Sequence, residues 1–243
     1  MSERDHDLTA AMQALAVLLV SGEELEVTLG RATGLAVETI PGCVAASVTL
    51  GSREGPTTRA SSGDGAHEAD QAQYDAGDGP CLEAMRTGSV VHVDDLADDD
   101  RWPAFAVEAR DRGFQSVLSV GLTVVDGGSG ALNLYASQPH AFAGAAERLA
   151  VLFASQCSMI ASTAELHARA ARLAEQMDQA LASRGVIDQA KGILMAEHGI
   201  DADAAFAMLV ERSQRSNRKL RELAAEIVRQ VSGSGDGPSP EDR

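Results

Sequence analysis

Aromatic side chains are scarce in this chain of 243 residues, where one Trp, two Tyr and five Phe amount to 3% of the composition. The chain contains no run of about 18 uncharged apolar residues of the kind that crosses a bilayer. Residues 1–7 also lack the positive and then apolar order of a secretory signal. The sequence therefore predicts a cytoplasmic protein that makes no contact with a membrane.

Cysteine and histidine are too scattered to build a metal site. Cys43, Cys81 and Cys157 form no Cys-x-x-Cys pair, so neither a zinc site nor a disulfide framework is indicated. The six histidines, at positions 6, 67, 92, 140, 167 and 198, show no metal-ligand spacing. We expect three reduced thiols, no metal and no cofactor.

Negative charge dominates the chain but is unevenly distributed. The formal net charge of −16 argues against indiscriminate binding to nucleic acid or to an anionic membrane. Residues 1–163 hold 9 basic and 23 acidic side chains, whereas residues 184–231 hold 8 and 7. Polyanion binding is therefore expected only in the C-terminal part.

Five cations lie between residues 212 and 221 with no carboxylate among them: Arg212, Arg215, Arg218, Lys219 and Arg221. A phosphate-bearing partner can approach such a segment without meeting negative charge. The alternative is a solvated helical surface whose charges are paired with nearby acids. Charge alone does not separate the two interpretations.

The N-terminal two thirds of the chain alternates helical and strand patterns. Helices are expected over residues 8–20, 23–39, 68–76, 82–86 and 102–112. Residues 44–50 have a strand pattern, and residues 116–125 and 131–135 flank Asp-Gly-Gly-Ser-Gly as a hairpin. This order predicts an α+β fold, with helices packed on an antiparallel sheet.

A long helix is expected over residues 145–184, because no proline occurs there and no glycine separates Gly144 from Gly185. A seven-residue rhythm places Leu149, Leu152, Met159, Leu166, Leu173 and Met177 on one seam. The alternative is one helix that lies on the sheet and then runs free. Because exposing so many apolar side chains is costly, we expect a parallel coiled-coil homodimer.

Three amphipathic helices are expected over residues 184–231, followed by a disordered tail over residues 232–243. Gly199 is expected to end the first helix and Asp201 to cap the second. Phe206 is assigned to the core of this bundle, and Gly192 is expected to allow the close approach of another helix.

The C-terminal residues closely match a known family. Arg184, Ile187, Ala190-Lys191-Gly192, Leu194-Met195, Ala205-Phe206, Leu209, Ser213 and Asn217-Arg218-Lys219-Leu220 occur in the order and spacing of the ANTAR domain. This stretch therefore resembles the RNA-binding antitermination module of bacterial regulators.

The ANTAR resemblance implies that exposed polar side chains within residues 184–231 bind a structured RNA with two hairpin elements. The expected contacts are Arg184, Gln189, Lys191, Arg212, Arg215, Asn217, Arg218, Lys219 and Arg221. With Phe206 placed in the core, no aromatic is left for base stacking, so recognition is expected to depend on RNA shape and phosphates.

Residues 8–163 resemble a GAF domain. The similarity lies in Gly-Asp-Gly-Pro-Cys-Leu-Glu-Ala (77–84), Thr-Gly (87–88), Asp-Asp-Leu (94–96), Arg-Trp-Pro-Ala-Phe (101–105) and Gly-Ala-Leu-Asn-Leu-Tyr-Ala (130–136). It implies a dimeric sensor of a small-molecule or protein signal. Tyr74, Asp75, Asp78 and Trp102 are the expected ligand contacts, although Trp102 is equally interpretable as a cap of the core.

Enzymatic activity is not expected, and no catalytic residue is assigned. Some GAF-fold proteins reduce free methionine sulfoxide, and Cys81 stands where such an enzyme places a reactive thiol. That chemistry needs a second nearby cysteine, and the other two cysteines of the domain, Cys43 and Cys157, are far from Cys81 in the sequence. The Asn-Lys pair of cyclic-nucleotide-binding GAF domains is absent as well.

The predicted chain thus consists of a GAF sensor (8–163), a coiled-coil linker helix (164–183), a three-helix ANTAR bundle (184–231) and a tail (232–243). The predicted function is signal-responsive transcription antitermination through structured RNA, with RNA polymerase affected indirectly. The alternative is a dimeric GAF-based interaction protein that recruits a protein partner and binds no RNA.

Overall fold

The computed structural model describes residues 24–233, and these divide into two compact units with a boundary between Ala168 and Arg169. Each unit is described by itself. The helix expected over residues 8–20 lies outside the described residues, as does the expected tail from residue 234 onward.

The N-terminal unit is built on one five-stranded sheet in the order β2-β1-β5-β4-β3, with every neighbouring pair antiparallel. The strands are β1 (Ala45–Ser52), β2 (Gly55–Ser62), β3 (Val90–Val93), β4 (Ser116–Val124) and β5 (Gly128–Ala136). The short 3-10 turn η1 (Val125–Gly127) joins β4 to β5. The predicted strand and hairpin are confirmed, and they form the three central strands.

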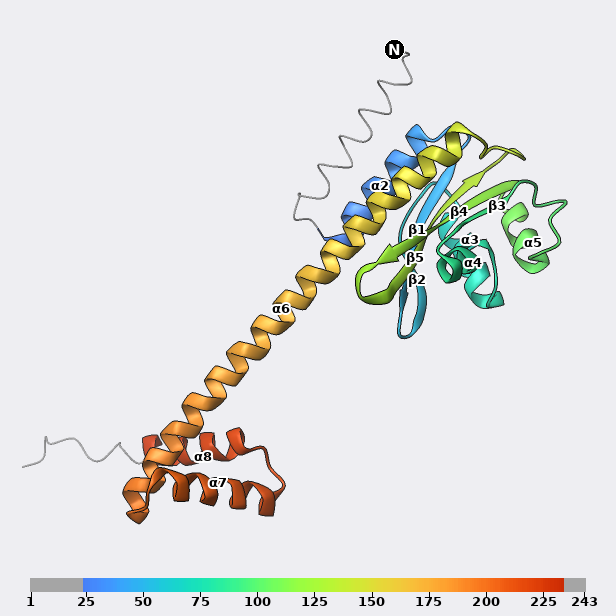
Figure 1. Cartoon of the computed structure of the whole chain (residues 1–243). Helices are drawn as coiled ribbons and strands as arrows, with labels where there is room; N and C mark the ends of the chain where they lie inside the picture. The colour runs from blue at the N-terminus through green and yellow to red at the C-terminus, as the bar shows by residue number, and fades with distance from the viewer. Residues whose placement is uncertain (1–23, 234–243) are drawn as a thin grey trace, which may run out of the picture. The chain divides into compact units, whose positions relative to one another are not determined.

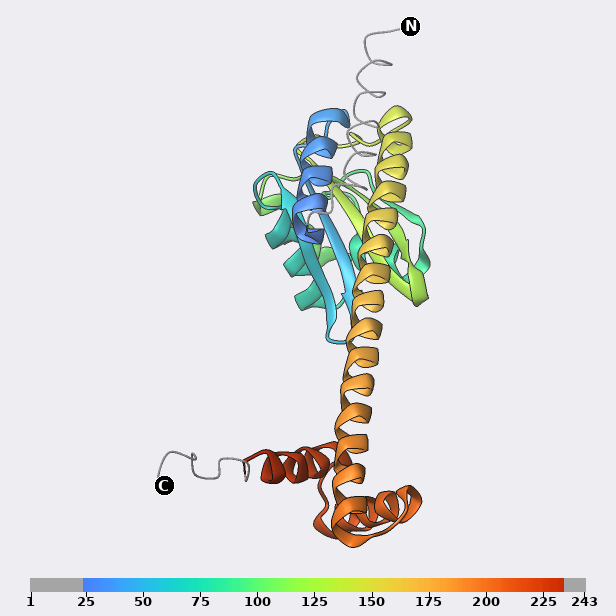
Figure 2. The ribbon, with the colours of Figure 1, turned by 90° about the vertical axis from the view of Figure 1, so that its left-hand side faces the viewer.

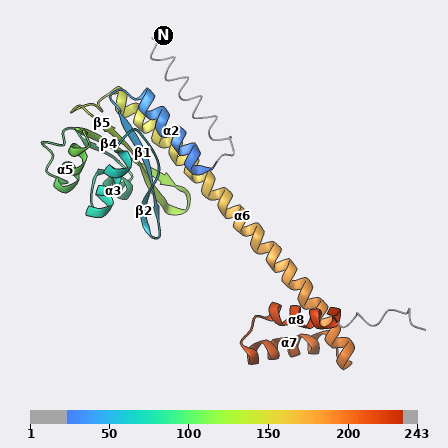
Figure 3. The ribbon, with the colours of Figure 1, turned by 180° about the vertical axis from the view of Figure 1, so that it is seen from behind.

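Helices cover both faces of this sheet (Figures 1 and 3). On one face, α2 (Leu25–Thr39) runs beside the first part of α6 (Ala145–His198), as Figure 2 shows. On the other face lie α3 (Ala66–Ala76), α4 (Pro80–Thr87) and α5 (Pro103–Asp111). The alternation of side chains along each strand supplies one core to each face.

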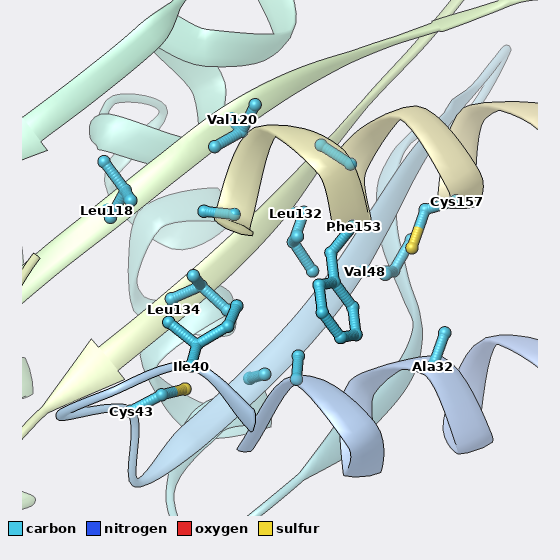
Figure 4. Close-up of a cluster of buried hydrophobic side chains, with 14 of the residues drawn as sticks. Ala32, Ile40, Cys43, Val48, Leu118, Val120, Leu132, Leu134, Phe153 and Cys157 are labelled. Atoms are coloured by element: carbon cyan, nitrogen blue, oxygen red, sulfur yellow. The ribbon is translucent and has the colours of Figure 1, made fainter. Parts of the chain in front are cut away.

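The core beneath α2 and α6 is mostly apolar. Figure 4 shows Phe153 of α6 beside Leu132 and Val48 of the sheet, with Ala32 on the neighbouring α2. All four are completely buried. Burial of apolar side chains such as these is the main contribution to the stability of a folded domain.

Close contact between α4 and the sheet depends on a glycine. A Cβ added to Gly121 of β4 would lie 2.6 Å from the Ala84 carbonyl oxygen and 2.7 Å from Gly88. The Gly121 amide also donates to the Ser89 carbonyl over 3.0 Å. Any side chain at this position would push the end of α4 away from the sheet.

Neither edge strand is predicted from the sequence, and the reasons are physical. β2 reads Gly-Pro-Thr-Thr-Arg-Ala-Ser-Ser, so it lacks the alternating apolar pattern that marks a half-buried strand. β3 has only four residues, which is too short for its periodicity to stand out. Pairing with β1 and β4, rather than local propensity, places these segments in the sheet.

Helix α6 is longer than predicted, because it runs through Gly185 to His198 without a break. The expected domain boundary at residue 184 therefore lies inside a helix. Among the helices in residues 24–233, α6 alone is long and apolar enough, by length and composition, to cross a membrane. Its most apolar 18-residue window is 33% buried inside the protein.

Candidate RNA-binding surface and buried polar cluster

The C-terminal unit is a three-helix bundle formed by the end of α6, α7 (Ala202–Ser216) and α8 (Leu220–Gly233). Its core consists of Ala190, Leu194, Ala205, Leu209, Leu223, Ala224 and Ile227. As predicted, Gly199 ends α6 with a positive φ of 65°, and the Asp201 carboxylate caps α7 by accepting from the Ala204 amide over 2.8 Å. The helix α8 extends to Gly233, two residues into the expected tail.

Two details of the predicted bundle are wrong. Gly192 is exposed, and a Cβ added there would meet nothing within 4 Å, so no helix packs closely against it. Phe206 is 43% exposed instead of buried. The core is filled instead by Ala190, Ala205 and Ala224, each completely buried, together with Leu194, Leu209, Leu223 and Ile227.

The second half of the bundle carries a group of exposed cations that we call the α7–α8 cations. They are Arg212 and Arg215 on α7, Arg218 and Lys219 in the turn, and Arg221 on α8. Asn217 ends α7 in a left-handed conformation with φ 50°, and its backbone amide donates to the Gln214 and Ser213 carbonyls. Asn217 therefore shapes the turn that displays its neighbours.

Two of the α7–α8 cations are paired with acids. Arg215 bonds to Glu211, and Arg218 Nη1 lies 2.7 Å from Glu226 Oε2. The Arg218 hydrogen bond holds the pKa of the Glu226 carboxyl below its ordinary value. Within the described part of the chain, Arg212, Lys219 and Arg221 form no ion pair, so these three are directly accessible to phosphate.

Three further candidate residues lie on α6. At 100° per residue, Arg184 and Lys191 share one side of α6, whereas Gln189 is turned about 160° away from Lys191. Lys191 Nζ lies 3.4 Å from Asp188 Oδ1 and 6.0 Å from the centre of the Phe206 ring. The nine candidate RNA contacts therefore lie on two segments, with Arg184, Gln189 and Lys191 on α6 and the other six on the second half of α7, the following turn and the start of α8.

The N-terminal unit contains a buried polar cluster that the sequence analysis did not predict. It lies between the centre of the sheet and helices α3 and α4, and it includes Ser47, Thr49, Thr58, Asp70, Gln73, Tyr74, Cys81, Ser119, Asn133 and Tyr135. All buried side-chain N and O atoms of the described residues have a hydrogen-bond partner. Because each buried polar group is hydrogen-bonded, the cost of removing it from water is offset, and a small domain can hold many such groups.

Asp70 is the centre of the polar cluster and is completely buried. Its Oδ1 accepts from the Tyr135 hydroxyl over 2.6 Å and from Asn133 Nδ2 over 3.0 Å, and its Oδ2 accepts from Thr58 over 2.8 Å. Burial raises the pKa of Asp70, and these hydrogen bonds oppose that shift. The alternation Leu132-Asn133-Leu134-Tyr135 was the available signal, because it points two polar side chains to one face of a strand.

The structure places the four expected ligand contacts in three different settings. Tyr74 bonds to Thr49 and Thr58 at 2.8 Å within the polar cluster, and Trp102 is buried, with its indole N–H donating to Asp78 over 3.1 Å. Asp75 is exposed and accepts from Gln71. Trp102 therefore belongs to the core beneath α3 and α5, the second of its two expected roles.

Cys81 lies in the polar cluster as a buried thiol. Its Sγ is 3.4 Å from Thr49 Oγ1 and 3.3 Å from Asn133 Nδ2, and burial raises its pKa to about 12. Cys43 and Cys157 lie in the core on the opposite face of the sheet. A protonated thiol without a cysteine partner is a poor nucleophile. Residues 24–233 also contain no group of three or more His, Cys, Asp or Glu side chains suited to a metal ion.

Comparisons with known proteins agree with this architecture. A family model described as GAF domain matches residues 22–160, and one described as ANTAR domain matches residues 175–228. No curated protein matches the chain in sequence.

Among solved structures, the chain is similar to a free methionine-R-sulfoxide reductase from Neisseria meningitidis in complex with its substrate. The TM-score is 0.51 at 15% identity, over 70% of this chain and 95% of that one. The GAF domain of an Acinetobacter phosphoenolpyruvate-protein phosphotransferase has a TM-score of 0.50 at 17% identity, over 70% and 98%. At these identities the similarity shows the fold alone.

A sheet covered by helices on both faces, followed by a three-helix unit with displayed cations, defines a two-module regulatory protein. The chain belongs to the GAF family, and an ANTAR domain follows its GAF domain. This combination points to the signal-regulated antitermination regulators.

Proposed function

We propose that this protein is a signal-responsive antitermination regulator that binds structured RNA through its ANTAR domain. The observation that carries the proposal is the display of the α7–α8 cations on and beside the turn between α7 and α8, with no carboxylate between residues 212 and 221. Guanidinium groups bind phosphate oxygens through paired N–H donors, which suits the backbone of a folded RNA. The rest of the chain is too acidic to compete for such a ligand.

The ion pairs found on this surface do not oppose the proposal. Arg215 and Arg218 are paired with carboxylates that are themselves partly exposed. Exposed pairs of this kind contribute about 0–1 kcal/mol, so a phosphate can replace the carboxylate at small cost. Arg212, Lys219 and Arg221 need no such exchange.

A parallel homodimer is the proposed working form. The seam residues of α6 are exposed in the single chain: Leu152, Met159, Leu166, Leu173 and Met177 are between 40% and 59% accessible. A second copy of α6 would bury them in heptad register. Such a dimer presents two ANTAR domains, one for each hairpin element of the RNA.

The proposed mechanism requires only that binding favours one RNA fold over another. RNA held as paired hairpins cannot form the competing terminator, so RNA polymerase continues and is affected indirectly. The GAF domain would control this binding in response to a small-molecule or protein signal, and the protein would act in the cytoplasm.

The test is a selection on the purified full chain from a pool of hairpin RNAs with randomised loops, at moderate salt. We expect specific RNAs to be recovered, and we expect R218A/K219A/R221A to lose their binding while its circular dichroism stays unchanged. The matched control R53A/R86A/R110A removes three exposed cations of the GAF domain and should bind normally.

Two outcomes would contradict the proposal. If no specific RNA were recovered, the proposed RNA-binding function would be wrong. If the protein bound duplex DNA in preference to RNA, its ligand would be DNA instead. Capture of one protein from a lysate, in a preparation that binds no RNA, would favour the alternative of a GAF-based interaction protein. Unfolding of the triple variant would assign the three residues a structural role instead.

A further inference from the structure

The exposed ring of Phe206 is exceptional in this protein. The other four phenylalanines, Phe105, Phe114, Phe142 and Phe153, are at most 3% exposed, whereas Phe206 is 43% exposed. It does not fill the bundle, whose core is made of alanine, leucine and isoleucine side chains. An aromatic ring held on a rigid helix and left open to solvent is available to a ligand.

The surroundings of Phe206 carry positive charge. Lys191 Nζ lies 6.0 Å from the ring centre, within the range of a cation–π contact, and Arg184 lies on the same side of α6 two turns earlier. Asp188 lies 3.4 Å from Lys191 but is 60% exposed, so this ion pair is readily exchanged. A flat apolar surface beside exchangeable cations complements a base and its phosphate.

A second copy of the chain is a less suitable occupant. In the heptad register of α6, Arg184 and Lys191 take the position that Leu149 and Met177 occupy earlier in the helix. Two successive layers of like charge between parallel helices are unfavourable. The apolar seam therefore ends before Arg184, and the face that bears Lys191 and Phe206 stays open in a dimer.

We propose that Phe206 is a stacking platform for one unpaired base of the bound RNA, and that Lys191 binds the phosphate next to that base. This inference rests on the proposed RNA-binding function and adds a second contact region to the α7–α8 cations. Recognition then includes a base that must be free of pairing, in addition to RNA shape and phosphates.

The test combines protein and RNA changes in one cycle. The probe is a hairpin RNA recovered by selection on the wild-type full chain, prepared with an abasic nucleotide at each loop position in turn. With wild-type protein, removal of one particular base should weaken binding by about 5- to 150-fold, the effect of one base–aromatic stack. Phe206→Leu should weaken binding of the intact RNA to the same extent and should be insensitive to removal of that base.

Control variants separate stacking from packing and from charge. Phe206→Tyr keeps the ring and should bind like wild type, and Lys191→Met should reduce the slope of log affinity against log salt by about 0.7. Sedimentation of Phe206→Leu should match wild type.

Binding by Phe206→Leu equal to wild type would overturn this inference alone, since the RNA is still bound. Dissociation of the Phe206→Leu dimer would also overturn it, because the ring would then contact a second copy. Failure to select any RNA would overturn the proposed function together with this inference.

Discussion

Arg218 Nη1 and Glu226 Oε2 lie 2.7 Å apart, so one candidate RNA contact is held by a carboxylate on the neighbouring helix. In the proposed complex, an RNA phosphate would compete with Glu226 for Arg218. Both side chains are partly exposed, which makes the exchange inexpensive but not free. The acid therefore competes with the ligand at this position.

Glu226→Gln should consequently tighten RNA binding by about two- to fivefold, because it removes the competing charge. A filter-binding or fluorescence titration with a selected RNA measures the change. Glu222→Gln, an exposed neighbour on α8, removes the same charge without touching the Arg218 pair and should have a smaller effect. Equal gains in both variants would mean that net charge, and not release of Arg218, is responsible.

Asp70→Asn should change how the stability of the GAF domain depends on pH. The folded pKa of Asp70 is raised above its ordinary value of 3.8. The contribution of this carboxyl to the free energy of unfolding is therefore fully present below pH 3.8. The contribution then falls at about 1.4 kcal/mol per pH unit and is lost once the pH has risen through the folded pKa. Thermal unfolding from pH 4 to pH 8 should show a flatter profile for Asp70→Asn than for wild type.

The control for Asp70 is Asp75→Asn, because Asp75 is an exposed carboxylate on the same helix. Its pH profile should follow that of the wild type. An Asp70→Asn profile that also follows the wild type would show that this buried carboxyl does not titrate in the range.

Leu173→Glu should dissociate the proposed dimer. Leu173 is 57% exposed and lies on the apolar seam of α6, so a partner helix would bury it. Loss of one buried leucine from such a seam costs about 2–5 kcal/mol, and the change to a carboxylate adds to this. Sedimentation velocity over a concentration series measures the shift from dimer to monomer.

Ala171→Glu introduces the same charge two residues away, off the seam, and should leave the dimer intact. A wild-type chain that sediments as a monomer at every concentration would contradict the coiled coil. So would a Leu173→Glu chain that stays dimeric.

The three cysteines should resist modification in the folded protein. Cys43, Cys81 and Cys157 are all buried, and burial raises the pKa of each thiol to about 12. Reaction requires the thiolate and access to it, and both are missing here. A thiol-specific chromophore should report much less than one reactive group per native chain and all three in denaturant. Rapid labelling of Cys81 in the native state would reopen the enzymatic interpretation.

Much of the candidate RNA-binding surface is readable from the sequence, because an amphipathic helix assigns its apolar residues inward and leaves its charges outside. The positions of Arg212, Lys219 and Arg221 follow from that rule. Phe206 is an apolar residue for which this rule fails. It shares a helical side with Leu209 and Val210, so periodicity places it in the core, whereas the structure buries the neighbouring Ala205 and leaves Phe206 43% exposed.

The sequence by itself determined the order of the two domains, the central strands, the long helix and the separation of acidic from cation-bearing parts. These features depend on local periodicity and on charge along the chain. Only the tertiary structure decided that Asp70, Asn133 and Tyr135 meet in one buried cluster, that β2 and β3 complete the sheet, and that Glu226 holds Arg218. Each of these depends on side-chain or backbone contacts between separate segments, which no local pattern of the sequence records.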